Sequence, residues 1–366
     1  MGAFSDKKNI FVICGGGFSE WDISIRSARS LHGWICQKTY NIFFVIIDHD
    51  GQWRLLSAQM FQKTTDGGEV GCFIPDQDGG YWKGTSRIKV HVIFPMVHGR
   101  LGEDGALSGL CDALDMPYVG SGMLGSAMCW DKSVTKRILH SFDIPYVPFL
   151  SLKHWCNKAE SMYTYNAVCQ KFKTNDLFIK PAMDGSSVGV SMVSDEKTYI
   201  QAMKKTLSLY DKVMIEPRIE GDEIECAVLD DCGVKASALG QIVTPQGRFY
   251  TYKEKYSSTS MTKTLFPEHI SSYLTKKIQD LAIQCFCALE CKGMARVDFF
   301  VTNQKKIMVN EVNTIPGFTS ISLYLKMWEK SGMRPERVVQ VLIDEALKRW
   351  HSKRFYAQKG EKLCQE

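Results

Sequence analysis

The chain has 366 residues, of which 45% are hydrophobic and 23% are charged, the composition of a folded globular protein of two or three domains. Lys and Arg exceed Asp and Glu by 45 to 40, an excess too small to indicate nucleic acid but compatible with a small anionic substrate. The longest apolar run, residues 42–47, is too short to cross a membrane, and no apolar signal region begins the chain. We therefore expect neither nucleic acid nor a membrane as partner.

The 13 cysteines also bear on the location of the protein. Their number is odd, most lie in apolar runs, and no C-x-x-C pair occurs. This usage is typical of reduced, buried thiols rather than of a disulfide framework or a zinc site. We expect a cytoplasmic protein.

The N-terminal third of the chain alternates predicted strands with helices. Strands are expected at residues 10–14, 42–47 and 88–97, and a helix at 106–116, where Pro117 ends it. The first strand runs into three consecutive glycines, Gly15 to Gly17. This alternation predicts a parallel sheet with helices on its faces.

Two further α/β segments follow. In the second segment, helices are expected at 131–142 and 195–210, and strands at 177–180, 187–193 and 213–216. In the third segment, a strand at 224–229 and a long helix around 274–289 precede strands 294–301 and 307–313 and helices from about 320 and 335. The last residues are polar and basic, and we expect them to fray.

The strands predicted at 294–301 and 307–313 carry the most informative pattern of polar residues. Because side chains alternate along a strand, Arg296 and Asp298 share one face, as do Glu311 and Asn313. In the antiparallel hairpin that the short turn predicts, two carboxylates and an amide oxygen can meet. Such ligands suit Mg²⁺ held together with substrate phosphates. The pattern alone is equally compatible with a solvated hairpin face.

The hairpin leads directly into a segment rich in Pro, Gly, Thr and Ser, residues 313–323. The N-terminus of the helix that follows offers free N–H groups and a partial positive charge, which can bind an anion. Ordinary capping by Thr319 or Ser320 is the commoner role of such a segment. Its position next to the candidate metal ligands favours the anion site.

Lys180 ends a predicted strand and is followed by a loop of small residues, 182–190. Backbone N–H groups in such a loop can approach phosphates, and Lys supplies a point charge. No P-loop sequence occurs in the chain. Gly185–Gly189 matches the G-x-S-x-G elbow of serine hydrolases, but a strand rather than a helix is predicted to follow. Phosphate binding is therefore favoured.

Three other loops carry charged residues at strand ends. The acidic segment 216–225 could accept hydrogen bonds from ribose hydroxyls or simply form a solvated turn. Glu20 could bind a cationic amine, whereas the glycines before it do not fit the dinucleotide pattern G-x-G-x-x-G. The polar loop 98–105 follows the third strand, where loops of an open sheet tend to build binding sites.

Together these stretches resemble the D-alanine–D-alanine ligases of the ATP-grasp superfamily. The resemblance rests on GGGFSE, FPMVHGRLGEDG, PYVGS with SAMCWDKSVTK, FIKPAMDGSSVGV, EGDEIECAVL, YTYKEKYS, ARVDFF and NEVNTIPGFTSISLY. They run in family order from Gly15 to about Gly332, nearly the whole chain. The chain departs from the family pattern at Phe18, Trp21 and Ser108, where Ser, His and Gln are common.

The resemblance implies an α/β fold, an ATP-grasp ligase of three α/β domains whose N-terminal domain has a Rossmann-like parallel sheet. The implied parts are an N-terminal substrate domain (1–122), a central ATP-grasp subdomain (123–218), a C-terminal ATP-grasp domain with the metal and oxyanion site (219–350) and a polar tail (351–366). ATP would be held between the central and C-terminal domains. The loop from about 240 to 267, which lacks apolar periodicity, is predicted to be a lid over ATP.

The resemblance also implies ATP-dependent ligation of two D-alanine molecules to D-alanyl-D-alanine for peptidoglycan synthesis. The carboxylate of one D-alanine would attack the γ-phosphate of ATP, giving an acyl phosphate and ADP. The amine of the second would then attack the carbonyl, and phosphate would leave. A related ligase with D-serine or D-lactate as second substrate is the alternative. The oligomeric state stays open, with a homodimer among the options.

Each site residue is assigned by its match to a family motif. The implied ligands of two Mg²⁺ ions, with Mn²⁺ as an alternative metal, are Asp298, Glu311 and Asn313. The implied ATP-binding residues are Lys132, Lys180, Ser187, Glu216, Glu223 and Lys255. The implied catalytic residues are Glu20, Ser186, Tyr256, Arg296, Gly317 and Ser322. The implied substrate-binding residues are Glu20, His98, Ser322 and Leu323.

Within these sets, the resemblance implies distinct roles. Arg296 and the Gly317 amide would form the oxyanion site, and Glu20 would bind the first substrate's ammonium group. Ser186 and Tyr256 would complete a hydrogen-bonded clamp across the domains. Catalysis would rest on positioning and charge neutralisation, without a covalent enzyme intermediate.

Two other classes of protein are alternatives to a ligase: an ATP-binding protein without turnover and a serine hydrolase. An ATP-binding protein without turnover would not need an oxyanion Arg296. A serine hydrolase would need a His, for which His269 is a candidate, and an Asp placed to serve the serine of its elbow. ATP dependence of product formation separates these classes.

Overall fold

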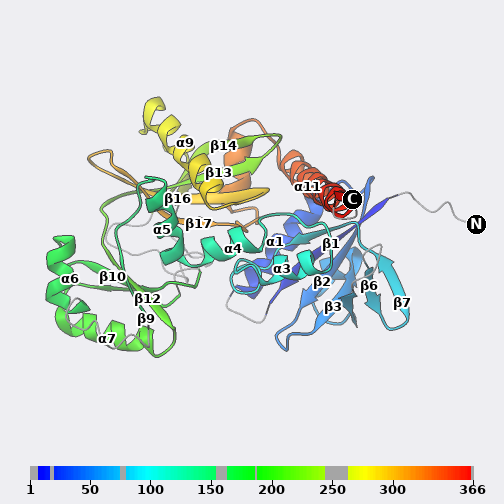
Figure 1. Ribbon diagram of the computed structural model, residues 1–366, viewed down its shortest axis with the longest axis horizontal. Helices are drawn as coiled ribbons and strands as arrows, with labels where there is room; N and C mark the ends of the chain where they lie inside the picture. The colour runs from blue at the N-terminus through cyan, green and yellow to red at the C-terminus, as the bar shows by residue number, and fades with distance from the viewer. Residues whose placement is uncertain are drawn as a thin grey trace, which may run out of the picture.

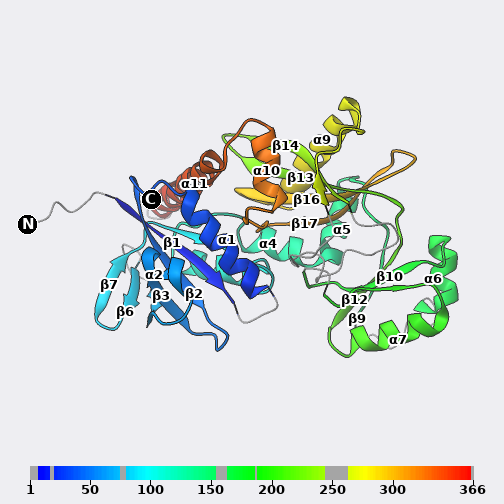
Figure 2. The same cartoon turned by 180° about the vertical axis from the view of Figure 1, so that it is seen from behind.

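Figure 1 shows a computed structural model of the chain, which describes residues 7–16, 20–74, 80–153, 163–185, 188–243 and 263–363. An N-terminal region lies at one end of the molecule and a central region at the other, with a C-terminal region between them; Figure 2 shows the same order from behind. All three regions combine sheets with helices, which confirms the predicted α/β class. The predicted boundaries at 122, 218 and 350 stay predictions.

The N-terminal region is built on a five-stranded sheet in the order β4-β3-β2-β1-β8. Strand β1 pairs in parallel with β2 and β8, whereas β3 and β4 are antiparallel at one edge. The predicted parallel sheet is therefore confirmed at its centre. The strands are β1 (Lys8–Gly15), β2 (Tyr40–Ile47), β3 (Trp53–Ser57), β4 (Glu69–Val70) and β8 (Val92–Pro95), and the helices are α1 (Trp21–Trp34), α2 (Ala58–Lys63) and α3 (Ala106–Ala113).

The single strand predicted at residues 88–97 is wrong. Its first part belongs to β7 (Ser86–Lys89) of a separate antiparallel sheet with β5 (Cys72–Ile74) and β6 (Gly80–Lys83). Its second part is β8, which pairs with β1. One straight strand cannot pair with both sheets, and an unbroken apolar pattern gives no sign of the change between them. The helix predicted at 106–116 ends at Ala113.

The central region is an antiparallel sheet in the order β11-β10-β12-β9, with α6 and α7 on one side. The elements are β9 (Leu150–Lys153), β10 (Leu177–Pro181), β11 (Ser191–Val193), β12 (Lys212–Pro217), α6 (Tyr165–Phe172) and α7 (Glu196–Leu207). Of the strand predicted at 187–193, only the last three residues form β11. Helices α4 (Met123–Trp130) and α5 (Lys132–Ser141) precede this sheet, and α5 confirms the helix predicted at 131–142.

The C-terminal region is an antiparallel sheet in the order β15-β14-β13-β16-β17. Helix α9 covers one face, and α10 and α11 lie on the other. The elements are β13 (Gly221–Asp230), β14 (Val234–Val243), β15 (Lys263–Leu265), β16 (Met294–Thr302), β17 (Ile307–Asn313), α9 (Ser272–Ala288), α10 (Leu323–Lys330) and α11 (Pro335–Leu363).

One hydrophobic core joins the N-terminal and C-terminal regions. It contains Ile10 and Phe44 of the N-terminal sheet, Trp328 of α10, Leu342 of α11 and Leu229 of β13. Helices α10 and α11 thus lie between the two sheets. This arrangement holds α1 and the loop that follows β8 close to the end of β17.

The predicted polar tail, residues 351–366, is helical up to Leu363 as the last part of α11. Its start is held against the N-terminal region, where Trp350 Nε1 donates to the Asp115 carbonyl at 2.8 Å and Lys353 to Asp112 Oδ1 at 2.9 Å. These partners are distant in sequence, so composition did not reveal them. In the part of the chain that the structure describes, no helix has the length and apolar character to span a bilayer.

Candidate active site

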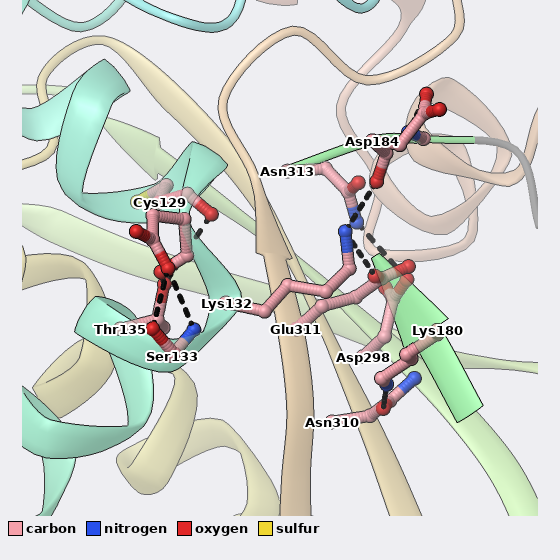
Figure 3. Close-up of polar contacts among 12 residues, drawn as sticks. Cys129, Lys132, Ser133, Thr135, Lys180, Asp184, Asp298, Asn310, Glu311 and Asn313 are labelled. Carbon is pink, nitrogen blue, oxygen red and sulfur yellow. Dashed lines mark hydrogen bonds and ion pairs between the residues drawn. The ribbon is translucent and has the colours of Figure 1, made fainter. Parts of the chain in front are cut away.

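The β16–β17 hairpin carries the polar residues that the sequence predicted to meet. Across the ladder Arg296 faces Asn313 and Asp298 faces Glu311, and a β-bulge follows. The Arg296 guanidinium donates from Nε and Nη2 to the two carboxylate oxygens of Asp298, each at 2.7 Å. Asn313 Nδ2 donates to Asp298 Oδ2 at 3.0 Å. The predicted hairpin is confirmed, and Figure 3 shows Asp298, Glu311 and Asn313 close together on it.

Arg296 is held between two acidic side chains. In addition to its pair with Asp298, its Nε lies 3.3 Å from Glu225 Oε2 on the neighbouring strand β13. Burial alone would lower the pKa of Arg296, but the carboxylates of Asp298 and Glu225 raise it above its ordinary value. The forked hydrogen bonds fix the plane of the guanidinium. Arg296 is therefore a preoriented positive charge in a desolvated site, which is what stabilises a developing oxyanion.

Figure 3 shows Lys132 reaching toward the hairpin from the start of α5. Its Nζ donates to the backbone carbonyl of Asp184 at 2.6 Å and lies 3.4 Å from Glu311 Oε2. Asp131 caps α5 by accepting from two backbone N–H groups and forms an ion pair with Lys212 of β12. This cap fixes the first turn of the helix and thereby the position from which Lys132 extends.

Two lysines surround one glutamate on the central sheet. Glu216 of β12 pairs through Oε2 with Lys180 at 2.7 Å and through Oε1 with Lys136 of α5. Lys180 also donates to Asn310 Oδ1 of β17 at 3.4 Å. Burial would raise the pKa of Glu216, but the two ammonium groups lower it below its ordinary value. Burial lowers the pKa of Lys136 to about 8.

This cluster differs from the sequence expectation in its contacts. The sequence assigned Lys180 to phosphate and Glu216 to ATP, and the structure pairs the two with each other. The sequence did not predict a role for Lys136. The structure shows that it is fully buried, and charged groups are almost never buried without a partner. From the sequence, Lys136 could be placed only on the same helix as Lys132, four residues later. Its partner Glu216 lies on β12, which the sequence pattern of α5 does not reveal.

The hairpin also contains the predicted metal ligands. Asp298 and Glu311 face each other across the ladder, and Asn313 contributes an amide whose Oδ1 can bind a cation while Nδ2 donates to Asp298. Across the described ranges, no three His, Cys, Asp or Glu side chains are grouped as a metal site. Two carboxylates and an amide are too few to enclose a metal alone. They do fit Mg²⁺, which takes one or two carboxylates together with substrate phosphates.

Glu20 lies at the N-terminus of α1, beside two glycines whose missing side chains make room for it. A Cβ atom on Gly99 would stand 2.3 Å from Glu20 Oε2, and one on Gly185 would stand 3.1 Å away. Nearby, Glu103 accepts from the Gly99 N–H at 2.8 Å. Burial, and secondly the charge of Glu20, raise the pKa of Glu103 to about 8. Two neighbouring carboxyl groups of this kind suit an ammonium group as ligand.

The turn after β17 leads to the N-terminus of α10. Ser322 is the N-cap residue, and its Oγ accepts from the Thr319 N–H at 3.1 Å. A Cβ atom on Gly317 would stand 2.7 Å from that Oγ, so a side chain at 317 would displace the Ser322 hydroxyl. The Leu323 side chain is buried, which leaves its backbone N–H as the group that can meet a substrate. Capping by Thr319 or Ser320 is not observed.

His98 is buried, and both of its ring nitrogens contact protein atoms. Nδ1 lies 3.0 Å from the Ile315 carbonyl and Nε2 lies 2.9 Å from Ser27 Oγ. Burial lowers the pKa of His98 to about 4, so the ring is neutral near pH 7. The predicted contact between His98 and substrate therefore stays a prediction, and the contacts observed are to the turn that carries Gly317.

Several predicted residues lie outside the described residues: Phe18, Ser186, Ser187, Lys255 and Tyr256. The loop predicted as a lid, 240–267, is described only at its two ends. Its first residues belong to β14 and residues 263–265 form β15, which pairs with β14. Glu223 is half-buried on β13, two residues before Glu225 and on the same face of the strand.

Comparison with known proteins identifies the family. The model for the D-ala D-ala ligase N-terminus matches residues 9–121, and the model for the D-ala D-ala ligase C-terminus matches residues 138–344. A D-alanine–D-alanine ligase of Coxiella burnetii (strain CbuK_Q154) is 39% identical over 357 residues, which cover 94% of this chain and 95% of that protein. The chain belongs to the D-alanine–D-alanine ligase family.

Solved structures agree with this assignment of the fold. The structure of the D-alanine–D-alanine ligase from Coxiella burnetii has a TM-score of 0.88 and 35% identity, covering 99% of this chain and 100% of that one. The structure of the VanG D-Ala:D-Ser ligase from Enterococcus faecalis has a TM-score of 0.81 and 30% identity, covering 93% of this chain and 100% of that one. The ATP-grasp fold predicted from the sequence motifs is therefore confirmed.

Two departures from the ligase family pattern have visible roles. Trp21 Nε1 donates to the Ile47 carbonyl at 3.3 Å, and its ring lies 4.8 Å from that of His49. It therefore covers the end of β2 beside Gly15. Ser108 is buried in α3 and donates to the Gly105 carbonyl at 3.1 Å. Neither of these interactions involves the β16–β17 hairpin.

Proposed function

We propose that this protein joins two D-alanine molecules to D-alanyl-D-alanine at the expense of ATP, as a step of peptidoglycan precursor synthesis in the cytoplasm. The observation that carries the proposal is the hairpin on which the fixed Arg296–Asp298 pair meets Asn313 and faces Glu311. A protein that only bound ATP would not need a preoriented guanidinium at this point. Family membership over nearly the whole chain supports the same activity.

ATP lies, in this proposal, between the central and C-terminal regions. Lys132 and Lys180 neutralise phosphate oxygens, since both ammonium groups lie beside β17, Lys132 3.4 Å from Glu311 Oε2 and Lys180 3.4 Å from Asn310 Oδ1 (Figure 3). Glu216 and Glu223 meet the adenine amine and the ribose. Binding of phosphate by Lys180 would exchange its contact with Glu216, and Lys136 would keep that carboxylate paired.

The proposed metal is Mg²⁺, with Mn²⁺ as an alternative, and two ions would be held by Asp298, Glu311 and Asn313. When bound, the metal neutralises charge on the β- and γ-phosphates. The hard oxygen ligands of these three side chains support this choice. Arg296 stays engaged with Asp298 and keeps the acidic cluster from excess negative charge.

The chemistry at the substrates is positional. Glu20 binds the ammonium group of the first D-alanine, whose carboxylate attacks the γ-phosphate and displaces ADP, giving an acyl phosphate. Arg296 and the Gly317 N–H then stabilise negative charge on the acyl oxygen while the amine of the second D-alanine attacks that carbonyl and phosphate leaves. The N-terminus of α10, at Ser322 and Leu323, receives the carboxylate of the second D-alanine. Ser186 and Tyr256 complete the clamp to Glu20 in this proposal.

A second candidate is the same chemistry with D-serine or D-lactate as second substrate. The similarity to the VanG D-Ala:D-Ser ligase structure supports D-serine as an alternative second substrate. Sizing of the purified protein separately determines its oligomeric state, for which a homodimer is one of the options.

The activity is tested by ADP release coupled to a spectrophotometric readout, with D-alanine present and absent, and by chromatography of the product. We expect ADP and phosphate to form only with D-alanine, and L-alanine to be inert. D-Serine and D-lactate are added as competitors to assign the second substrate. ADP release that does not depend on any D-amino acid would refute the ligase proposal.

A further inference from the structure

The turn that follows β17 is held on both sides of Gly317 by residues of the N-terminal region, in addition to the Thr319–Ser322 contact within the turn. The Ile315 carbonyl contacts His98 Nδ1 at 3.0 Å, and the Phe318 N–H donates to Ser27 Oγ at 3.2 Å. Gly317 lies between these two attachment points. Ser27 belongs to α1, and His98 belongs to the loop after β8. More than 200 residues of chain therefore separate each partner from the turn.

The direction of every proton in this chain of contacts is fixed. A carbonyl can only accept, so the hydrogen of the neutral imidazole lies on Nδ1 and points to Ile315. His98 Nε2 is then an acceptor, and the Ser27 hydroxyl donates to it at 2.9 Å. This leaves a lone pair of Ser27 Oγ for the Phe318 N–H. The order from Ile315 through His98 and Ser27 to Phe318 has no alternative while the ring is neutral.

Burial makes this chain of hydrogen bonds costly to break. Ser27 and Phe318 have no exposed surface, and His98 is 7% exposed. Removal of the Ser27 hydroxyl would leave both the Phe318 N–H and His98 Nε2 without a partner in a site where water does not replace it. The turn would then shift to find other partners, and Gly317 would move with it.

Helix α1 connects this turn to Glu20, the residue proposed to bind the ammonium group of the first D-alanine. Glu20 begins the helix, and Ser27 follows seven residues later, two turns along the same face. Displacement of either end of this rigid element changes the relation between the Glu20 carboxylate and the Gly317 N–H. Misplacement by about 1 Å costs on the order of a hundredfold in rate when two groups must act on one substrate.

We propose that Ser27 and His98 are positioning residues, whose hydrogen-bond chain from Ile315 to Phe318 fixes the Gly317 N–H opposite Arg296 and sets its distance from Glu20. The inference rests on the proposed function, because Gly317 acts as an oxyanion donor only in that reaction. It assigns His98 to the turn and not to direct contact with substrate. This series of hydrogen bonds contributes to stabilisation of the transition state and not to ATP binding.

Ser27→Ala tests the proposal, with Ser24→Ala as the matched control. Ser24 lies one turn earlier on α1, is equally buried, and bonds the Gly15 N–H at 2.7 Å and the Met96 carbonyl at 2.5 Å, both within the N-terminal region. Both variants lose a buried hydroxyl with two partners. We expect Ser27→Ala to lower kcat by about 10- to 100-fold with KM for ATP within twofold, and Ser24→Ala to keep kcat within threefold.

Affinity for a phosphinate dipeptide analogue, whose tetrahedral oxygens resemble those of the intermediate, gives the readout that a merely structural role would not move. In Ser27→Ala this affinity should fall in proportion to kcat, whereas ATP affinity should not. His98→Asn and His98→Gln serve if Ser27→Ala does not fold. The Asn amide can reproduce the donor at Nδ1 and should retain more activity than Gln, which reproduces Nε2.

Equal losses of kcat in Ser27→Ala and Ser24→Ala, or unchanged phosphinate affinity in Ser27→Ala, would overturn the inference, as would equal activity of the two His98 variants. Failure of the proposed function has a different signature. In that case wild type itself would release no ADP in response to D-alanine, whatever the Ser27 variant did.

Discussion

Replacing Glu216 by Gln should destabilise the protein, because it leaves two ammonium groups beside a neutral side chain. Glu216 is 3% exposed and accepts from Lys136 on one oxygen and from Lys180 on the other. Lys136 has no exposed side-chain surface, and its other hydrogen bond and its ring contact within the described residues are neutral: the Val147 carbonyl at 3.2 Å and the Phe149 ring, whose centroid is 5.9 Å away. These neutral contacts cannot replace a carboxylate.

The magnitude follows from how Lys136 can respond. Removing one partner of a buried ion pair costs about 3–5 kcal/mol when the remaining charge stays buried. Lys136 can also lose its proton. Deprotonation costs about 1.4 kcal/mol for each unit by which the pKa exceeds the pH. The pKa of Lys136 is already lowered to about 8, so the cost near pH 7 is small. Lys180 has an 11% exposed side chain and regains some hydration. We therefore expect the free energy of unfolding to fall by about 3 kcal/mol, at the lower limit of the range.

The assay is urea unfolding at pH 7, followed by fluorescence and circular dichroism to detect intermediates in a chain of this size. Glu220→Gln is the control, since Glu220 is exposed and lies four residues further along the same segment. Lys136→Met combined with Glu216→Gln should recover part of the loss, because the buried cation is then absent. The loss should also shrink at pH 9.5, where Lys136 is neutral in wild type too.

A loss in Glu216→Gln within about 0.5 kcal/mol of that in Glu220→Gln, the ordinary range of surface substitutions, would refute the reasoning. So would a loss that grows as the pH is raised. The first result would mean that the cluster is hydrated in solution. The second result would mean that Lys136 does not lose its proton near pH 8, where its lowered pKa places the titration.

Three further predictions concern the reaction and its pH dependence. Asp298→Asn and Glu311→Gln should each lower kcat on the order of a hundredfold or more, since each removes a negative ligand; retention of more than about a third of kcat at saturating Mg²⁺ would contradict the metal assignment. Lys180→Ala should raise KM for ATP and lower kcat together, and unchanged ATP kinetics would remove Lys180 from the phosphate site. Glu103 has its pKa raised from 4.5 to about 8, so the native state holds a proton that the unfolded state releases, and unfolding free energy should fall as pH rises from about 4.5 to 8. Glu103→Gln should flatten that slope in pH-dependent urea unfolding, and an unchanged slope would assign it to other groups.

The hairpin could be predicted from sequence because its partners are close along the chain. The alternation of Arg296 and Asp298, a turn of known length, and Glu311 and Asn313 after it determine which side chains face each other. The same holds for α5 and α9, whose apolar periodicity and caps are local. The structure adds the bulge after Asp298 and the identity of Glu225 as second partner of Arg296, which depends on the register of a third strand.

Other parts of the site could not be predicted, since their contacts join distant elements. The division of 88–97 into two strands depends on which sheet each half joins. Burial of Lys136 and His98 depends on neighbours more than 70 residues away. The family resemblance gave roles to Lys180 and Glu216 individually, but only the structure shows that each is the other's partner.

That last pairing bears on how Glu216, proposed to bind ATP, can be buried beside Lys180, proposed to bind phosphate. If Glu216 had only Lys180 as partner, transfer of the ammonium group to a phosphate would leave a buried carboxylate unpaired, at a cost of several kcal/mol. Lys136, on the other oxygen, keeps the carboxylate paired during that exchange. In the proposed function, ATP therefore draws Lys180 toward phosphate while Glu216 stays paired with Lys136. The loss of Glu216 should therefore affect stability and ATP affinity together, whereas the loss of Lys180 should affect ATP affinity far more than stability.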